Sequence, residues 1–170
     1  MKAAKRFLGV ILFALMAVGT RAEEPSGQGL ETLFSMTMKD THGQPMSLSR
    51  FRGQPLIVNF WARVCPPCRE EIPELTALQS QYGKRGLVVL GIALENDPEK
   101  VREFLAAYDA GYLAALTGEQ EGYALMRALG NAESFLPFTL LIDRKGEVVL
   151  NKRGIFREGD FQGVAKKLLP

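Results

Sequence analysis

The sequence predicts a single α/β domain in which strands and helices alternate along the chain. Two mainly apolar runs, Leu56–Trp61 and residues 87–94, are typical of strands buried on both faces. Each run is followed by apolar residues at helical spacing. The 170 residues contain no internal repeat or low-complexity tract. They are enough for one domain with its own core.

The helices that follow these strands are marked by their apolar faces. After the first strand, four residues recur at close to helical spacing: Ile72, Leu75, Leu78 and Tyr82. The helix after the second strand begins at Asp97 and Pro98, because aspartate is a good N-cap and proline a good first helical residue. Its apolar face consists of Val101, Phe104, Leu105 and Tyr108.

Further elements are expected toward both ends of the chain. A short strand is predicted over residues 112–116 and a helix over residues 119–129. The segments Phe138–Ile142 and 147–150 flank a turn, which indicates a β-hairpin. A closing helix is marked by Phe161, Val164 and Leu168. Near the start, a two-stranded hairpin is indicated by Phe34, Met36, Met38, Met46 and Leu48.

The N-terminus has the layout of a secretory signal peptide. Basic residues precede an apolar run over residues 7–19, and small residues lie three and one positions before a cleavage point after Ala22. The run has 13 residues, whereas a membrane-spanning helix needs about 20. Export with cleavage is therefore favoured over an uncleaved membrane anchor. The predicted organisation is a signal peptide, a linker and one folded domain: residues 1–22, 23–33 and 34–170.

Removal of such a leader changes the charge balance. The whole chain has 21 basic and 19 acidic residues, and loss of residues 1–22 leaves 17 basic against 19 acidic. No basic stripe with interleaved aromatic residues remains, so nucleic acid is not expected as a partner. We expect an extracytoplasmic, for example periplasmic, monomer.

The two cysteines, Cys65 and Cys68, lie where the first buried strand ends and its helix begins. A disulfide persists in an oxidising compartment. However, a bridge that closes only four residues constrains the unfolded chain by about 2 kcal/mol, against more than about 4 kcal/mol for a long loop. A redox role is therefore favoured over a purely structural bridge.

Metal and haem sites are not supported by the sequence. A structural zinc site needs four Cys or His ligands, and the chain offers two cysteines and His42, which is expected to be exposed in a turn. Covalent haem attachment would need histidine directly after the second cysteine, where the chain has Arg69. We expect no cofactor other than the redox-active disulfide.

The position of the pair gives the two thiols different roles. A helix N-terminus favours a thiolate, which makes Cys65 the candidate nucleophile. Cys68, one turn into the helix, is placed to attack a mixed disulfide at Cys65 and release the reduced partner. Pro66 and Pro67 fit the first helical turn but donate no N–H to the Cys65 sulfur. This predicts a moderate thiolate, with a Cys65 pKa nearer about 7 than about 3.5.

Five stretches of the chain carry a resemblance to a known family: residues 48–53, 58–62, 65–69, 71–73 and 136–143. They resemble the TlpA/ResA/DsbE (CcmG) group of thiol-disulfide oxidoreductases. This resemblance implies a thioredoxin fold, with a central mixed β-sheet flanked by helices, an N-terminal β-hairpin and a central insertion. It also implies an exported protein disulfide reductase, with a family precedent in cytochrome c maturation. Exported cysteine-containing proteins would be the substrates and a membrane-bound thiol protein the electron donor.

The resemblance also implies supporting residues. Pro137 would be the cis-proline beside the active site, which leaves backbone free to pair with an extended substrate, although position alone fits an ordinary loop proline equally well. Glu95 would accept a proton from Cys68, and its alternative is a solvated loop acid. Asn59 stands where thioredoxins carry a buried aspartate, which favours a base elsewhere. Trp61 is expected in the core.

Two positions depart from the family pattern. Val64 precedes the first cysteine where tryptophan is common, and Phe138 follows the proline where threonine is common. Both are expected beside the docking groove, where they would alter partner choice or redox poise.

Two other functions are weaker alternatives. A peroxiredoxin-like thiol peroxidase would need a Pro and Thr motif that the Cys65 region lacks. A copper-binding thioredoxin-fold module would have a poor ligand set, since no histidine accompanies the cysteines.

Overall fold

The centre of the fold is strand β3 (Leu56–Trp61), in which all six residues are buried. In the computed structural model, which describes residues 27–169, β3 pairs in parallel with β4 (Val88–Ala93) and antiparallel with β6 (Phe138–Ile142). Seven strands form one mixed sheet in the order β2-β1-β5-β4-β3-β6-β7. The outer strands are β1 (Thr37–Asp40), β2 (Pro45–Ser47), β5 (Leu113–Leu116) and β7 (Val148–Arg153).

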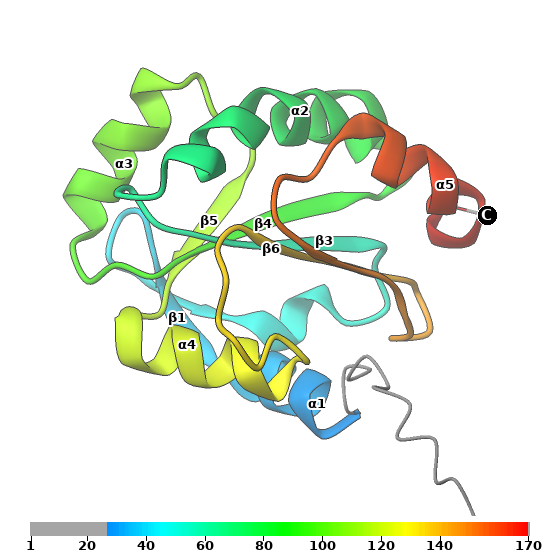
Figure 1. Cartoon of the computed structure of the whole chain (residues 1–170), viewed down its shortest axis with the longest axis horizontal. Coiled ribbons are helices and arrows are strands. Elements are labelled where there is room, and N and C mark those ends of the chain that lie inside the picture. Colours follow the sequence, from blue (N-terminus) through cyan, green and yellow to red (C-terminus); the bar gives the residue numbers. More distant parts are fainter. Residues whose placement is uncertain (1–26, 170) are drawn as a thin grey trace, which may run out of the picture.

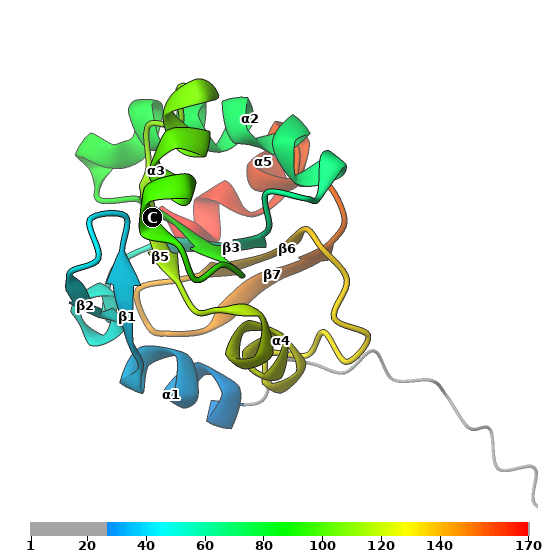
Figure 2. The ribbon, with the colours of Figure 1, turned by 90° about the vertical axis from the view of Figure 1, so that its left-hand side faces the viewer.

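Helices cover both faces of this sheet. Figures 1 and 2 place α2, α3 and α5 on one face and α1 and α4 on the other. The helices are α1 (Gly27–Ser35), α2 (Pro66–Tyr82), α3 (Pro98–Ala107), α4 (Glu119–Ala128) and α5 (Glu158–Leu168), with short 3-10 turns at Leu48–Phe51 and Gly83–Arg85.

The alternation of side chains along β3 explains why both faces are covered. Successive residues of a strand point to opposite faces. Ile57 packs with the apolar side chains of α2 and α5, whereas Val58 and Phe60 pack with those of α1 and α4. A continuous apolar run therefore needs a helical layer on each side.

Most of the predicted elements are confirmed. The N-terminal hairpin is formed by β1 and β2, the C-terminal hairpin by β6 and β7, and Asp97 caps α3 by accepting hydrogen bonds from two backbone N–H groups. The segment β5 lies between β4 and β1, so the central insertion extends the sheet. The fold is the expected thioredoxin-type α/β arrangement.

The linker expected over residues 23–33 is wrong for its described part. Residues 27–33 belong to helix α1, in which Leu30, Leu33 and Phe34 are buried. These three positions have helical spacing and form an apolar stripe against the core. Phe34 was expected to lie in a strand, and the stripe explains why it does not. The predicted signal peptide lies outside the described residues.

Between residues 27 and 169, no helix combines the length and the apolar character required to cross a bilayer.

Candidate active site

The disulfide lies at the junction of β3 and α2. Cys65 is the N-cap of α2, and Pro66 and Pro67 are its first residues. The first N–H groups of a helix have no intrahelical partner, so proline is tolerated there. The Sγ atoms of Cys65 and Cys68 are bonded at 2.03 Å, and the Cα atoms lie 5.4 Å apart. The predicted placement of the pair at a strand-to-helix junction is confirmed.

The two cysteines lie in different environments. Cys65 is partly exposed, whereas Cys68 is 2% exposed and belongs to an apolar cluster with Trp61. The Trp61 ring stacks on Phe104, with ring centroids 5.2 Å apart, and is buried in the core as expected. Only the Cys65 sulfur is accessible enough to meet a partner disulfide first.

In the oxidised protein, the Cys68 N–H donates to the Cys65 carbonyl oxygen at 3.2 Å. The sulfur of Cys65 receives no side-chain capping hydrogen bond.

The segment before β6 lies next to the disulfide. The Leu136–Pro137 peptide bond is cis. Leu136 and Cys65 both pack against the apolar cluster that contains Cys68. The Pro137 carbonyl accepts a hydrogen bond from the Gly154 N–H at 2.8 Å, whereas the Leu136 N–H and carbonyl have no hydrogen-bond partner among the described residues. The free backbone in this segment is therefore that of Leu136.

Glu95 is engaged by Arg63. The Arg63 backbone N–H donates to Oε1 of Glu95 at 3.0 Å, and Nη2 of Arg63 lies 3.1 Å from Oε2. Both carboxylate oxygens thus have a donor, and the side chain is 14% exposed. The role of Glu95 as proton acceptor stays a prediction.

A second acid, Glu71, was not predicted from the sequence and is fully buried. Its Oε1 accepts a hydrogen bond from Nδ2 of Asn59 at 2.6 Å, and its Oε2 accepts one from the Phe156 N–H at 2.9 Å. Burial raises the pKa of Glu71 to about 7, although the two hydrogen bonds and the charge of Arg157 oppose this rise. This carboxyl group can therefore gain and lose a proton near neutral pH.

Glu71 lies close to the resolving position. It follows Cys68 by three residues on α2, and side chains at this spacing are neighbours on one helix face. Both are buried on the side of α2 that faces the sheet. The sequence held a usable signal, because position 71 falls on the same stripe as Cys68, Ile72 and Leu75. A charged residue on that stripe is rarely buried without a function.

Asn59 is buried and acts as a hydrogen-bond donor, so the base expected elsewhere stays a prediction. Its amide donates to Glu71 and, at 3.0 Å, to Oγ1 of Thr139. Asn59 is thus a neutral hydrogen-bond donor to the buried acid, with which it shares the space between β3 and α2.

The two departures from the family pattern fall in different places. Val64 is 82% exposed beside Cys65, in agreement with a position at the docking surface. Phe138 is fully buried and packs against Phe60, with ring centroids 5.7 Å apart. The expectation that Phe138 lies in the docking groove is therefore wrong, because β6 turns this side chain into the core. The neighbouring exposed residue is Phe135, at 57%.

No group of three or more His, Cys, Asp or Glu side chains within residues 27–169 could hold a metal ion. His42 is exposed in the turn after β1, as predicted.

Comparison with known proteins agrees with this geometry. The Redoxin family matches residues 18–168. The thiol-disulfide oxidoreductase ResA of Bacillus thuringiensis subsp. konkukian (strain 97-27) is 25% identical over 136 residues, which are 80% of this chain and 76% of ResA.

Solved structures give the same result. A thiol:disulfide interchange protein of the thioredoxin family from Chlorobium tepidum TLS superposes with a TM-score of 0.65 and 28% identity, and the match covers 80% of this chain and 94% of that one. A Mycobacterium tuberculosis disulfide oxidoreductase homologous to E. coli DsbE has the same fold, with a TM-score of 0.67, 17% identity and coverage of 84% and 99%. The chain therefore belongs to the Redoxin family and, within the thioredoxin superfamily, to the TlpA/ResA/DsbE-like thiol-disulfide oxidoreductases.

Proposed function

We propose that this oxidoreductase is exported and reduces disulfides of other exported proteins, with the Cys65–Cys68 pair as its only redox group. The observation that carries this proposal is the asymmetry of the pair. One sulfur is accessible at a helix N-terminus, and the other is buried beside a carboxyl group with a pKa of about 7.

The first step is attack by the Cys65 thiolate on a substrate disulfide. The N-terminus of α2 stabilises this thiolate through its dipole and its unpaired N–H groups. A bond forms between the Cys65 sulfur and one substrate sulfur, and the other substrate sulfur leaves as a thiolate that takes a proton from solvent. The product is a mixed disulfide.

The second step is attack by Cys68 on the Cys65 sulfur. Cys68 is buried as a thiol and must lose its proton to become a nucleophile. Glu71, in its carboxylate form, accepts this proton. The Cys65–Cys68 disulfide forms, the mixed disulfide breaks, and the second substrate sulfur leaves reduced. Two electrons have passed from the pair to the substrate, and Glu71 then returns its proton to solvent.

The backbone before β6 is suited to hold the substrate. An extended segment would pair with the free N–H and carbonyl of Leu136. Val64, next to Cys65, and Phe135, next to Leu136, offer exposed apolar side chains. This mode gives affinity through backbone hydrogen bonds and therefore accepts many sequences. Apocytochromes c with paired cysteines are one such substrate class, and a membrane-bound thiol protein would re-reduce the pair.

The test is capture of partners by a resolving-cysteine variant. Cys68→Ala should accumulate mixed disulfides at Cys65 and lose more than about 90% of turnover, because release of the partner needs the second thiol. The matched control, Cys65→Ala, should trap no partner, and both variants should lack activity in an insulin disulfide reduction assay. Full activity in both variants would contradict the proposal, and peroxide consumption at a comparable rate would favour a thiol peroxidase.

A further inference from the structure

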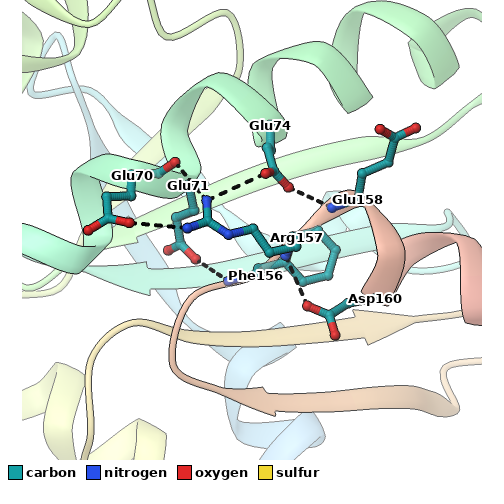
Figure 3. A network of polar contacts seen from close by, with 7 residues as sticks. All are labelled: Glu70, Glu71, Glu74, Phe156, Arg157, Glu158 and Asp160. Carbon is teal, nitrogen blue, oxygen red and sulfur yellow. Dashed lines mark hydrogen bonds and ion pairs between the residues drawn. The ribbon is translucent and has the colours of Figure 1, made fainter.

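Two acids of α2, Glu70 and Glu74, contact the side chain of Arg157, which directly precedes α5, and a third acid, Glu71, contacts the neighbouring Phe156 N–H (Figure 3). Nη2 of Arg157 lies 3.1 Å from Oε2 of Glu70, and Nη1 lies 3.4 Å from Oε1 of Glu74. Nη1 also donates to the Glu70 carbonyl oxygen at 3.3 Å. The guanidinium is thus held over the turn of α2 that carries Glu71.

The backbone on either side of Arg157 also donates hydrogen bonds to acids of the same turn of α2. The Phe156 N–H donates to Glu71, and the Glu158 N–H donates to Oε2 of Glu74 (Figure 3). The Arg157 N–H is itself capped by Oδ2 of Asp160 at 2.9 Å. Residues 156–158, hereafter the Arg157 segment, therefore deliver a cation and an N–H donor to the site together.

The other groups around Glu71 are mostly neutral. Asn59 of β3 donates to it, and the pKa of the partly buried Tyr112, before β5, is raised by burial and, to a smaller extent, by the charge of Glu71. Cys68 lies one turn earlier on α2. Among charged residues, Arg157 lowers the pKa of Glu71 and Glu74 raises it. Arg157 is thus the charge that offsets burial of the carboxylate.

We propose that Arg157 is a positioning residue for the redox reaction. It keeps Glu71 available as a carboxylate, because its segment places a positive charge and the Phe156 N–H beside that side chain. Glu70 and Glu74 orient the guanidinium. The proposal rests on the role of Glu71 as proton acceptor for Cys68.

A consequence is that protonation of Glu71 and the position of the Arg157 segment are linked. Both oxygens of the carboxylate accept hydrogen bonds from N–H donors that cannot accept one in return. A proton on either oxygen can occupy a lone pair that the two donors leave free, but it removes the charge and so weakens both hydrogen bonds. Protonation of Glu71 therefore weakens its contact with the Phe156 N–H and, through it, the hold on the Arg157 segment.

The experiment compares Arg157→Gln with Glu74→Gln in the oxidised full-length protein. The titration midpoint of Glu71 is followed by carboxyl NMR, and the pH profile of insulin disulfide reduction is followed in parallel. Loss of the Arg157 charge should raise the Glu71 midpoint by about half a pH unit, since the guanidinium is half exposed and partly screened. Loss of the Glu74 charge should lower it.

The Glu71 midpoint should shift in opposite directions in Arg157→Gln and Glu74→Gln, and this distinguishes the proposed role from a purely structural one. If the Arg157 segment only held the fold closed, either variant would loosen it, hydrate Glu71 and lower the midpoint. Arg157→Lys keeps the charge and should restore a midpoint close to that of the wild type, which also covers the case in which Arg157→Gln does not fold. Arg102→Gln on α3 is a matched control for loss of an exposed, ion-paired arginine and should change neither readout.

A Glu71 midpoint that stays unchanged or falls in Arg157→Gln would overturn the inference. If the midpoint rises as expected while the pH profile of the reaction does not move, Arg157 sets the charge state of Glu71, but the assignment of Glu71 as proton acceptor fails, and the role of Arg157 in the redox reaction fails with it.

Discussion

Glu71 and Glu95 are two acids close to the redox-active disulfide, and the fold treats them differently. Glu95 follows β4 and forms an ion pair with Arg63, which donates a hydrogen bond to each of the two carboxylate oxygens. Glu71 lies inside α2 and is bound by two neutral N–H donors. Its pKa is raised to about 7 by burial. The two acids thus differ in their partners, which are neutral N–H groups for Glu71 and a cation for Glu95.

The two acids also differ in their effect on the stability of the fold. A paired, partly buried carboxylate stabilises the fold modestly at neutral pH. A buried carboxylate with no direct ion pair destabilises it, because ionisation in an apolar site is unfavourable. A group that is retained in spite of this cost is a candidate for a chemical role.

The largest expected effect is on catalysis. Glu71→Gln keeps the size of the side chain but cannot take up a proton, so we expect the rate of disulfide reduction at pH 7 to fall by about 100-fold, within the usual range for loss of a general base. Glu95→Gln should lower the rate by no more than a few fold. Steady-state reduction of insulin measures both.

The opposite order of activities in the two variants would reverse the assignment of the proton acceptor. A collapse of activity in Glu95→Gln with an active Glu71→Gln would place the proton acceptor at Glu95. Circular dichroism of both variants controls for the fold.

The second effect is on the pH dependence of stability. Between pH 4.5 and about 7, the folded state holds a proton on Glu71 that the unfolded state has lost. Stability from this group is therefore complete below pH 4.5 and is lost as the pH rises to about 7. A shift of this size corresponds to a decrease of about 3 kcal/mol in the free energy of unfolding.

Urea unfolding of the oxidised protein at pH 5 and pH 8 measures this decrease. Glu71→Gln should remove most of the difference, since the other titrating groups are unchanged. An equal pH dependence in the wild type and the variant would mean that Glu71 is not the group that titrates.

The smallest effect is the contribution of the Glu95–Arg63 pair to stability. Glu95→Gln removes an ion pair whose side chains are 14% and 34% exposed. We expect the free energy of unfolding at pH 7 to fall by about 1 kcal/mol. Exposed Glu31, paired with Arg52 at 2.8 Å, offers a control, and Glu31→Gln should cost less. Equal losses would show that burial does not distinguish the two pairs.

Much of the fold could be predicted because its signals are local. The apolar run of β3, the Asp97 cap of α3 and the turn between β6 and β7 are each specified within a few residues. Helix α1 was missed because it is short and its apolar stripe was assigned in part to a strand. Its identity depends on packing against α4, which lies about 90 residues later.

The residues of the candidate site also fall into those that local sequence predicts and those that depend on distant contacts. Cys65, Cys68 and the two prolines were located because a strand-to-helix junction and proline tolerance are properties of adjacent residues. The interior position of Phe138 was not predicted, since its direction follows from the pairing of β6 with β3.

The sequence alone determined where the redox pair lies and which thiol begins the helix, because helix ends depend on nearby backbone groups. Only the tertiary structure decided which of the two acids is buried without a direct ion pair. Asn59 and Phe156 reach Glu71 from 12 and 85 residues away, and Arg63 reaches Glu95 from 32 residues away. Burial and ion pairing set the affinity of a carboxyl group for its proton, and both arise only when distant segments pack together.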